Sequence, residues 1–296
     1  MAYSYYPLTF YKYSGCGNDF ILIDDRSSDT PESIASHITH LCHRHEGIGA
    51  DGVILIQNGR QGSDVSITIY NADGSYAELC GNGLRCVIRC LHEDLGLDRS
   101  NYTISTMAGV YNAKLCGDDV EVMLGDAAPI LGPFRTPEAP SFPLYSVRIG
   151  VPHVVLICPD LEFIDVPTVG RQIRHSQQFQ PEGTNVNFIT LLDQHTLAIR
   201  TYERGVEAET LACGTGGAAS AIVAALHYKL SSPIHVRTSA GAHLRYHFQN
   251  HQGQAKQITM RGEARRNFQG IYQLPIQIPQ ENKLKSLREA SYALFS

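Results

Sequence analysis

Two short segments of the chain share one design: a cysteine, a glycine turn and then a helix-forming run. They are Cys80-Gly81-Asn82-Gly83 and Cys213-Gly214-Thr215-Gly216. Each is preceded by an alternating strand and followed by a strand, an Ala-Gly corner and another strand. The cysteines lie 133 positions apart (213 − 80), and the corner glycines, Gly109 and Gly241, lie 132 apart (241 − 109). This constant spacing indicates a duplicated unit, and hence two similar domains that face each other across a cleft.

Each cysteine stands where a helix is expected to begin. Apolar residues recur at helical spacing from Leu84 to Leu95 in the first copy and from Ala218 to Leu226 in the second. A helix N-terminus offers unpaired N–H groups and the positive end of the helix dipole, which bind anions and lower the pKa of a thiol from about 8.5. We therefore expect two activated thiols. The second helix is apolar nearly all round and is expected to be fully buried.

The composition is that of an ordinary globular protein. The 296 residues are 43% hydrophobic and carry a net charge of −5, with no long run of either sign. This balance argues against nucleic acid or an anionic membrane as a partner. No apolar stretch reaches the ~20 residues that span a bilayer, and the segment from Met1 to Phe10 does not resemble a secretion signal, so a cytoplasmic protein is expected.

The remaining cysteines and the histidines give no metal signature. Six cysteines are interpreted as small buried apolar residues in a reducing compartment: Cys16, Cys42, Cys86, Cys90, Cys116 and Cys158. Histidines gather near the end of a short helix expected over 34–42, but their intervals match no compact zinc pattern. No dinucleotide or phosphate-loop fingerprint is present either. We therefore predict neither a metal nor an organic cofactor.

A proline cluster divides the chain. Five prolines between Pro129 and Pro143 form the best candidate linker. We expect a first unit over 1–126 and a second over 127–270. A strand at 271–278 is expected to return to the first unit, and a polar tail follows at 279–296.

Several polar residues lie in turns that border the expected cleft. Asn18 lies in a glycine-flanked turn, and Asn71 ends a strand just ahead of the first cysteine. The segment Gly150-Val151-Pro152-His153 is also expected to form a turn, which makes His153 a loop residue. Asn and His are common in turns for purely structural reasons, and that reading stays open from the residues alone.

Two thiols on opposite sides of a cleft suit one kind of reaction. A thiolate can remove a proton from a carbon acid while a thiol on the other face returns one, which inverts a stereocentre. The N–H groups of the two helix N-termini can bind a carboxylate and stabilise the charge that develops on it. The residues alone therefore favour a racemase or epimerase that needs no cofactor.

Five motifs together resemble diaminopimelate epimerase. They are Gly15-Cys16-Gly17-Asn18-Asp19-Phe20, Asn71-Ala72-Asp73-Gly74-Ser75, Cys80-Gly81-Asn82-Gly83-Leu84-Arg85-Cys86, Pro181-Glu182-Gly183-Thr184-Asn185, and Glu203-Arg204-Gly205 with Ala212-Cys213-Gly214-Thr215-Gly216. The resemblance implies a pyridoxal-independent isomerase that interconverts LL- and meso-diaminopimelate on the route to lysine and peptidoglycan. It also implies an α/β fold of two similar units, each a curled mixed sheet around a central helix, and usually a homodimer.

The resemblance also implies roles for individual residues. Cys80 and Cys213 match the family's acid–base pair. The positions that match its substrate-binding residues are Asn18, Asn71, Gly81, Asn82, Asn185, Glu203, Arg204, Gly214 and Thr215. His153 and Glu203 match positions thought to tune the thiols. Arg204 suits a bidentate contact with the distal carboxylate of the substrate.

Two features depart from the family pattern. Val151 stands where the family usually has Asn, so one amide that would bind the distal end of the substrate is missing. One extra residue falls at Val206-Glu207-Ala208, in the loop ahead of Cys213. We expect an epimerase with a looser distal pocket, active also on other 2-amino acids.

Other classes of protein remain as alternatives. One is another two-cysteine racemase or epimerase, such as the proline racemase group, although the asparagines and Glu203-Arg204 argue against it. A second is a non-enzymatic module whose glycine-headed helices bind a phosphate or carboxylate. A third is a zinc protein, which metal analysis would reveal.

Overall fold

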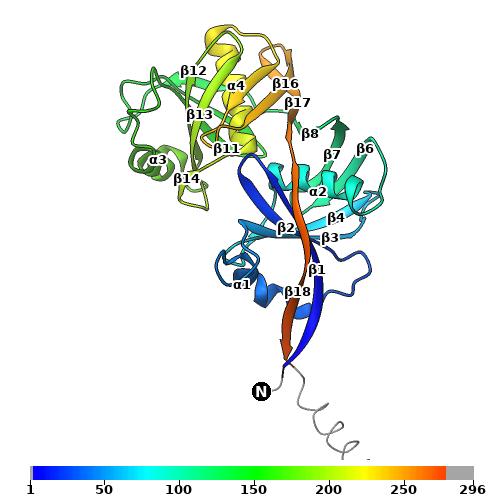
Figure 1. Ribbon diagram of the computed structural model, residues 1–296. Coiled ribbons are helices and arrows are strands. Elements are labelled where there is room, and N and C mark those ends of the chain that lie inside the picture. The colour runs from blue at the N-terminus through cyan, green and yellow to red at the C-terminus, as the bar shows by residue number, and fades with distance from the viewer. Residues whose placement is uncertain (1–2, 278–296) are drawn as a thin grey trace, which may run out of the picture.

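The chain folds into two units of the same design, which lie one above the other in Figure 1. The structure is a computed structural model that describes residues 3–277. The expected tail over 279–296 lies outside the described residues, as does the last residue of the expected strand at 271–278. None of the helices within the described part of the chain is long and apolar enough to cross a membrane.

The first unit contains eight strands and two α-helices. The strands are β1 (Tyr3–Gly15), β2 (Asn18–Asp24), β3 (Gly52–Asn58), β4 (Val65–Asn71), β5 (Tyr76–Ala77), β6 (Asn101–Thr106), β7 (Gly109–Cys116) and β8 (Asp119–Gly125). The helices are α1 (Ile38–Cys42), which follows a 3₁₀ turn at Glu32–His37, and α2 (Gly81–Glu93).

The second unit repeats this series. Its strands are β9 (Leu131–Phe134), β10 (Leu144–Ile149), β11 (Val151–Ile157), β12 (Asn185–Leu191), β13 (Thr196–Glu203), β14 (Ala208–Thr210), β15 (Ile234–Arg237), β16 (His243–His251) and β17 (Gln254–Glu263). Its helices are α3 (Val166–His175), followed by a 3₁₀ turn at Gln177–Phe179, and α4 (Gly214–Tyr228). The last strand, β18 (Arg265–Gln277), returns to the first unit.

Strand pairing confirms the duplication expected from the sequence. In the first unit β2 and β3 pair in parallel, β3 and β4 pair antiparallel, and β4 and β6 pair in parallel. In the second unit β11, β12, β13 and β15 repeat these pairings in the same order. Within each unit, the cysteine-headed helix connects the last two of these strands. Each unit is therefore a mixed sheet with a central helix.

Both faces of each sheet are covered, which explains the continuous apolar runs of the central strands. In β3, Ile54 and Ile56 pack in the cluster around α2, whereas Val53 and Leu55 pack on the opposite face with Ile38 of α1. Alternate side chains of a strand point to opposite faces, so one apolar run serves both layers. In the second unit α3 covers the face opposite α4 in the same way.

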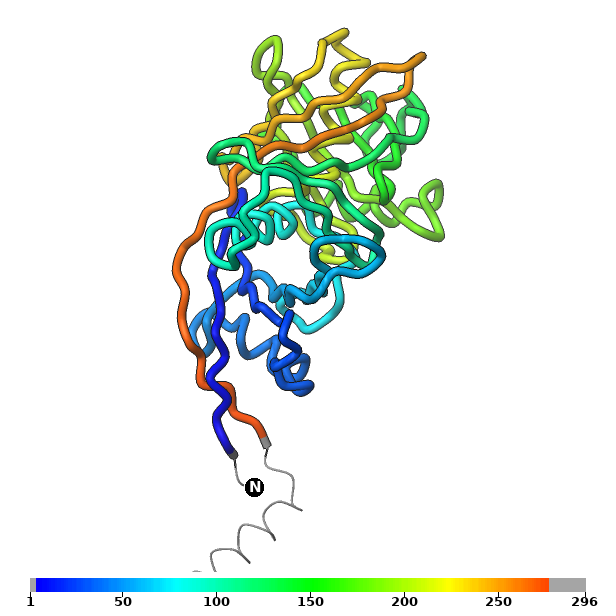
Figure 2. Tube along the Cα trace, turned by 90° about the vertical axis from the view of Figure 1, so that its right-hand side faces the viewer, coloured from blue at the N-terminus to red at the C-terminus, as the bar shows by residue number. Residues whose placement is uncertain are grey.

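Strand pairing also joins the two units. β8 pairs antiparallel with β17, so the two sheets are continuous. β18 then runs antiparallel along β1 over its whole length, and Figure 2 shows these two strands side by side as a long ribbon. The pairing begins at Arg265, opposite Ser14, which is earlier in the chain than the expected strand at 271–278.

Some local expectations are wrong. Gly150 alone, at φ +67°, reverses the chain, because its left-handed backbone makes the hairpin without help from its neighbours. Val151 then pairs with Ile149, and His153 lies in a strand rather than a loop. Leu226, near the end of α4, is 52% exposed, so this helix is not fully buried. Of the six cysteines expected to be buried, Cys116 is only half-buried, and the other five are buried as expected.

Candidate active site

Cys80 and Cys213 occupy the same position in the two units. Cys80 is the N-cap of α2, and its Sγ accepts a hydrogen bond from the backbone N–H of Gly83 at 3.4 Å. Cys213 is the N-cap of α4 and accepts the corresponding bond from Gly216 at 3.4 Å. Both cysteines are half-buried. Each thiol therefore lies at a helix N-terminus, where the next N–H groups have no partner within the helix.

The two helix N-termini meet at the boundary between the units. A Cβ atom added to Gly214 would lie 3.8 Å from the Cα of Gly81. The thioether of Met260, from β17, packs against both glycines. The structure thus brings Cys80 and Cys213 together at one site, to which both units contribute.

Burial dominates the acidity of both thiols. It raises the pKa of Cys80, and the N–H groups of Gly83 and Asn82 oppose it only in part. Burial, and then the carboxylate of Glu203, raise the pKa of Cys213 well above its usual range. The expectation of lowered thiol pKa values is therefore wrong, because removing a thiolate from water outweighs the favourable N–H groups.

Glu203 places a carboxylate beside both thiols. It ends β13, and its Oε2 accepts a hydrogen bond from Thr210 Oγ1 at 2.8 Å. Burial raises the pKa of Glu203 itself. Its negative charge also raises the pKa of Cys80 and of Cys213. Proton positions on these three groups are therefore linked.

His153 is a buried neutral residue of β11. Its side chain is 0% exposed, and burial, followed by the charges of Arg204 and Arg148, lowers its pKa to about 3. Its Nδ1 lies 3.4 Å from Nδ2 of Asn187, which can only donate, so the ring proton belongs on Nε2. That Nε2 has no hydrogen-bond partner among the described residues. A buried donor without a partner is rare, and a catalytic role is one of the explanations for such a group.

Asn18 and Asn82 join Cys80 to the rest of the first unit. Oδ1 of Asn18 accepts a hydrogen bond from Nδ2 of Asn82 at 3.3 Å and lies 3.7 Å from Sγ of Cys80. Nδ2 of Asn18 donates to Asp51 Oδ2 at 2.8 Å, which fixes the orientation of the amide. These contacts hold Asn18 with its oxygen towards the thiol.

Asn185 and Arg204 form a second polar group, in the second unit. Oδ1 of Asn185 accepts a hydrogen bond from the backbone N–H of Arg204 at 2.9 Å. The Arg204 guanidinium donates to the carbonyl oxygen of Glu182 at 3.1 Å. The carboxylate of Glu182 is bound by Arg148 at 2.9 Å and lies 3.9 Å from Arg204. As far as the described residues show, the Arg204 guanidinium therefore keeps N–H donors that can bind a ligand.

The remaining expected residues lie around these groups. Thr215 follows Cys213 in the first turn of α4, and its Oγ1 lies 3.8 Å from Sγ of Cys213. Asn71 is exposed and donates to Ser75 Oγ at 2.9 Å, a contact within its own turn. Val151 is half-buried at the start of β11, two residues before His153.

The loop with the extra residue forms a tight turn. Glu207 has φ +56°, and its carboxylate accepts a hydrogen bond from the backbone N–H of Gly205 at 3.1 Å. The same carboxylate pairs with Arg174 of α3 at 3.2 Å. The insertion is therefore anchored to α3 and leaves β14 to pair with β13.

Three residues of the site carried no predicted role. Asp51 binds Asn18, Met260 covers both helix N-termini, and Arg85 donates to Asn82 Oδ1 at 3.0 Å. Arg85 belongs to the motif that begins at Cys80, and this motif could have indicated that Arg85 lies at the site. The contacts of Asp51 and Met260 depend on pairing between distant strands, and local patterns do not reveal them.

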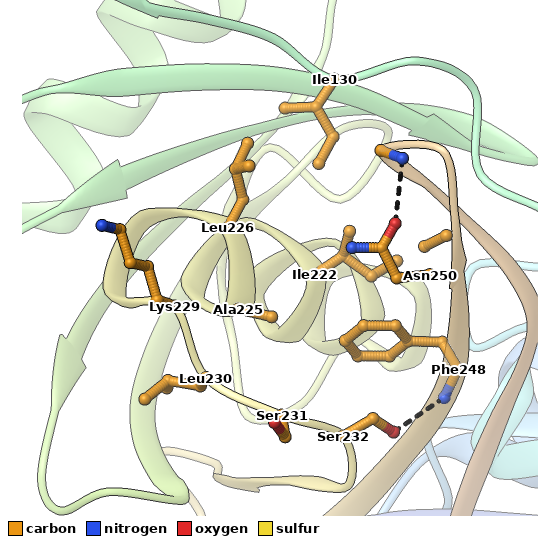
Figure 3. A pocket seen from close by; sticks show the side chains of 12 residues that line it. Ile130, Ile222, Ala225, Leu226, Lys229, Leu230, Ser231, Ser232, Phe248 and Asn250 are labelled. Carbon is orange, nitrogen blue, oxygen red and sulfur yellow. Dashed lines mark hydrogen bonds between the residues drawn. The ribbon is translucent and has the colours of Figure 1, made fainter.

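A separate pocket of about 540 Å³ lies at the other end of α4 (Figure 3). Its wall includes Ile222, Leu226 and Phe248, and none of the expected site residues. Two of its polar side chains are bound by the backbone: Ser232 Oγ accepts a hydrogen bond from the N–H of Phe248 in β16, and Asn250 Oδ1 accepts one from Gly253 within a turn. The side chains expected to take part in catalysis therefore lie at the N-termini of α2 and α4 and not in this pocket.

Comparison with known protein families gives one match that spans both units. The sequence model described as diaminopimelate epimerase matches residues 10–130 and 145–267. The diaminopimelate epimerase of Aquifex aeolicus is 37% identical over 274 residues, which is 89% of this chain and 97% of that protein. The diaminopimelate epimerase of Hydrogenobaculum is 37% identical over 279 residues, which is 88% of this chain and 96% of that protein.

Solved structures share the fold at low sequence identity. A phenazine biosynthesis protein of the PhzF family from Bacillus anthracis matches with a TM-score of 0.69 at 13% identity, over 92% of this chain and 100% of that one. A hydroxyproline epimerase from Agrobacterium vitis matches with a TM-score of 0.64 at 15% identity, over 93% and 94%. At this identity the likeness concerns the fold alone.

Proposed function

Because the chain belongs to the diaminopimelate epimerase family and is therefore an isomerase, we propose that it interconverts LL- and meso-2,6-diaminopimelate with Cys80 and Cys213 as its two acid–base groups. The observation that carries this proposal is the meeting of two cysteine-capped helix N-termini at the boundary between the units. Diaminopimelate serves both lysine and peptidoglycan-precursor synthesis. The activity is thus an epimerisation in amino-acid biosynthesis.

In the proposed reaction, one cysteine acts as a thiolate and the other as a thiol. The thiolate takes the proton from the α-carbon, so that the C–H bond breaks and an S–H bond forms. The electron pair left on carbon delocalises into the carboxylate. The opposite thiol then gives its proton to the other face of the carbon, and the stereocentre is inverted. The two thiols suffice as base and acid, so the step takes no cofactor.

The burial of the thiols suits this chemistry. An α-proton next to a carboxylate is a weak acid, and a thiolate of raised pKa is a stronger base towards it. Burial also strengthens every electrostatic interaction inside the site. The N–H groups of Gly81, Asn82, Gly214 and Thr215 belong to the first helical turns and have no partner within their helices. In the proposal they bind the reacting carboxylate and stabilise the enediolate.

We assign the distal end of the substrate to the polar group around Arg204. Its guanidinium is bound on one side by the Glu182 carbonyl, which leaves donors for a carboxylate. Asn185 and Asn71 would contribute amide contacts, and Asn18 would bind near Cys80. His153, held neutral, and Glu203 would set the proton affinities of the thiols. Val151 offers no polar contact, and this supports a pocket that also accepts other 2-amino acids.

Deuterium exchange at the α-carbon tests the proposal. The purified protein, treated with a chelator, is incubated with LL-diaminopimelate in heavy water, and the product is followed by NMR. We expect exchange together with the meso form. Cys80→Ala and Cys213→Ala should each lower the rate by about 10²–10⁴-fold, the usual contribution of a positioned acid or base.

A control substitution separates the site from the rest of the chain. Cys116 is also half-buried but lies in β7, so Cys116→Ala should keep the wild-type rate. Exchange on another 2-amino acid but not on diaminopimelate would refute diaminopimelate as the substrate but would still support the two-thiol mechanism. No exchange on any amino acid would refute an epimerase and favour an anion-binding module.

The assembly and location of the protein are part of the same proposal. By family resemblance we propose a homodimer in the cytoplasm that binds neither nucleic acid nor membrane. Analytical ultracentrifugation at micromolar concentration tests the assembly, and a monomer under those conditions would contradict it.

A further inference from the structure

Arg85 is a fully buried arginine in the second turn of α2. Its side chain is 0% exposed and is the largest of the fully buried side chains in the described part of the chain. Its nitrogens contact Gly81 O, Asn82 Oδ1, Glu263 O, Cys16 Sγ and Met260 Sδ, at 3.0–3.5 Å. These contacts come from both units, because Met260 and Glu263 belong to β17.

None of these partners carries a charge. Two are backbone carbonyls, one is an amide and one is a thioether. The fifth, Cys16, is a thiol, because burial raises its pKa. Buried arginines are normally paired with a carboxylate, since an unpaired charge in a protein interior is costly. A guanidinium with only neutral partners within hydrogen-bond distance therefore favours an anion that forms close to it.

The N-terminus of α2 is where such an anion would lie. Arg85 reaches back one turn to the carbonyl of Gly81 and the side chain of Asn82. Asn82 in turn binds Asn18, whose oxygen faces Cys80. The positive charge of Arg85 also lowers the pKa of Cys80, against the effect of burial. The guanidinium thus supports the turn that holds Cys80 and acts electrostatically on its thiol.

Among the described residues of the second unit, no cation stands at the position that matches Arg85. Five positions after Cys213 stands Ala218, a buried residue, where Arg85 stands five positions after Cys80. The carbonyl of Gly214 is bound instead by the hydroxyl of Tyr246, at 2.8 Å. The two halves of the site therefore use a charged donor on one side and a neutral donor on the other.

We propose that Arg85 is a positioning residue of the Cys80 half of the site: it fixes the first turn of α2 and supplies the positive charge that an anion at this helix N-terminus requires. The relevant anions are the Cys80 thiolate and, on the proposed function, the carboxylate and enediolate of the substrate. This role rests on the proposed function, but it can be tested without measuring turnover of a substrate. Arg85 itself does not touch the reacting atoms.

Other groups around Cys80 also bear on its protonation. Those that act directly on Cys80 or on Arg85 are Glu203, Cys213, Cys16, Cys86 and Tyr246. Asp119 and Glu263 act on Cys16, and Lys12 acts on Cys86. Glu203 raises the pKa of both thiols, so substitution of Arg85, rather than the comparison of the two cysteines alone, isolates the effect of the arginine.

The first test compares the two cysteines within the wild-type protein. Alkylation by iodoacetamide is followed over a range of pH without substrate, and mass spectrometry of peptides gives a rate for each thiol. The thiolate is the reactive form, so each profile reports an apparent pKa. We expect the apparent pKa of Cys80 to lie below that of Cys213 by about one unit or more. An equal or higher value for Cys80 would overturn the proposal.

The second test separates charge from hydrogen bonding at position 85. Arg85→Gln keeps amide donors and removes the charge, so alkylation of Cys80 at neutral pH should slow about tenfold while Cys213 changes less than about twofold. Arg85→Lys keeps the charge and should restore most of the Cys80 rate. Circular dichroism and a melting curve report folding of each variant.

Each outcome of the second test is decisive. Equal slowing at both thiols, or failure of the Lys variant to recover Cys80 although it folds, would make Arg85 merely structural and refute the proposal. If the Gln variant does not fold, the wild-type profiles and the folded Lys variant still decide the matter. A failure to epimerise diaminopimelate, by contrast, would leave these alkylation rates unchanged and would refute only the proposed substrate.

Discussion

Gly81 and Gly214 approach each other closely where α2 and α4 begin, and Met260 packs against both. A Cβ atom added to Gly214 would lie 3.8 Å from the Cα of Gly81 and 2.9 Å from Sδ of Met260. The first turns of the two helices can therefore meet only because neither residue has a side chain. The glycine that follows each cysteine serves close packing between the units.

Replacing Gly214 by Ala should separate the two helix N-termini. The added methyl displaces Met260, so we expect a destabilisation of about 1–3 kcal/mol, as for other overpacked sites. The rate of epimerisation should fall about tenfold or more, because small misplacements of acid–base groups are costly. Urea unfolding and kcat/KM measure the two effects.

A double substitution provides the control for Gly214→Ala. Met260→Ala removes the group that the new methyl meets, although it also leaves a cavity. If the clash is the cause, the double variant is destabilised by less than the sum of the two single changes. Strict additivity would contradict the proposed contact.

Much of the fold could be predicted from local patterns. The strand–turn–helix order around Cys80 and Cys213, and the corner glycines Gly109 and Gly241, indicate the duplication, and the paired strands repeat it. Pairing between strands that are distant in the chain is harder to predict from local sequence patterns. The start of β18 at Arg265 and the join of β8 to β17 depend on the whole fold.

The site, like the fold, could be predicted from the sequence only in part. The motifs indicate which residues gather at the helix N-termini, but they do not show how much water surrounds them. The thiols were expected to have lowered pKa values from helix position alone, and burial reverses that result. His153 was expected in a loop, but Gly150 alone makes the hairpin. Solvent exclusion and tertiary contacts are properties of the packed structure.

His153 should make stability depend on pH. Its pKa falls from an ordinary 6.5 to about 3 in the folded state. Above 6.5 the residue is neutral in both states and has no effect. As the pH falls from 6.5 towards 3, the unfolded chain binds a proton that the folded protein does not, so stability decreases by about 1.4 kcal/mol per pH unit.

Urea unfolding at several pH values measures this effect. Between neutral pH and about pH 5, the loss of stability should be about 2 kcal/mol smaller in His153→Gln than in the wild type. The exposed His45, replaced in the same way, serves as the control for the loss of one histidine. Identical slopes for His153→Gln and wild type would show that His153 takes up its proton over the same pH range in the folded protein as in the unfolded chain.

Oxidation should stop the reaction if the cleft brings the two thiols together. Cys80 and Cys213 are half-buried at adjoining helix N-termini, so a mild oxidant such as diamide is expected to join them in a disulfide. Mass spectrometry should show the linked peptides, and dithiothreitol should restore activity. Cys213→Ala serves as the control and should yield no such link. Full activity of the oxidised wild-type protein would exclude the bridge.

Substitution of Val151 tests how the site binds the distal end of the substrate. It begins β11, and its neighbour Pro152 accepts a hydrogen bond from Asn185 at 3.2 Å, so position 151 adjoins the polar group around Arg204. Val151→Asn should add an amide there and raise the preference for LL-diaminopimelate over 2-aminoheptanoate, which lacks the distal ammonium and carboxylate groups. The expected gain is about 1–3 kcal/mol, or about 5- to 150-fold in the ratio of the two kcat/KM values.

The matched control for Val151→Asn is Val151→Ala, which shortens the side chain without adding an amide. If the missing amide limits discrimination, the Ala variant keeps the wild-type ratio or lowers it, and only the Asn variant raises it. An unchanged ratio in Val151→Asn would mean that water or another side chain already fills this role. The wild-type protein would then discriminate as well without an amide at position 151, and the looser distal pocket would have to be abandoned.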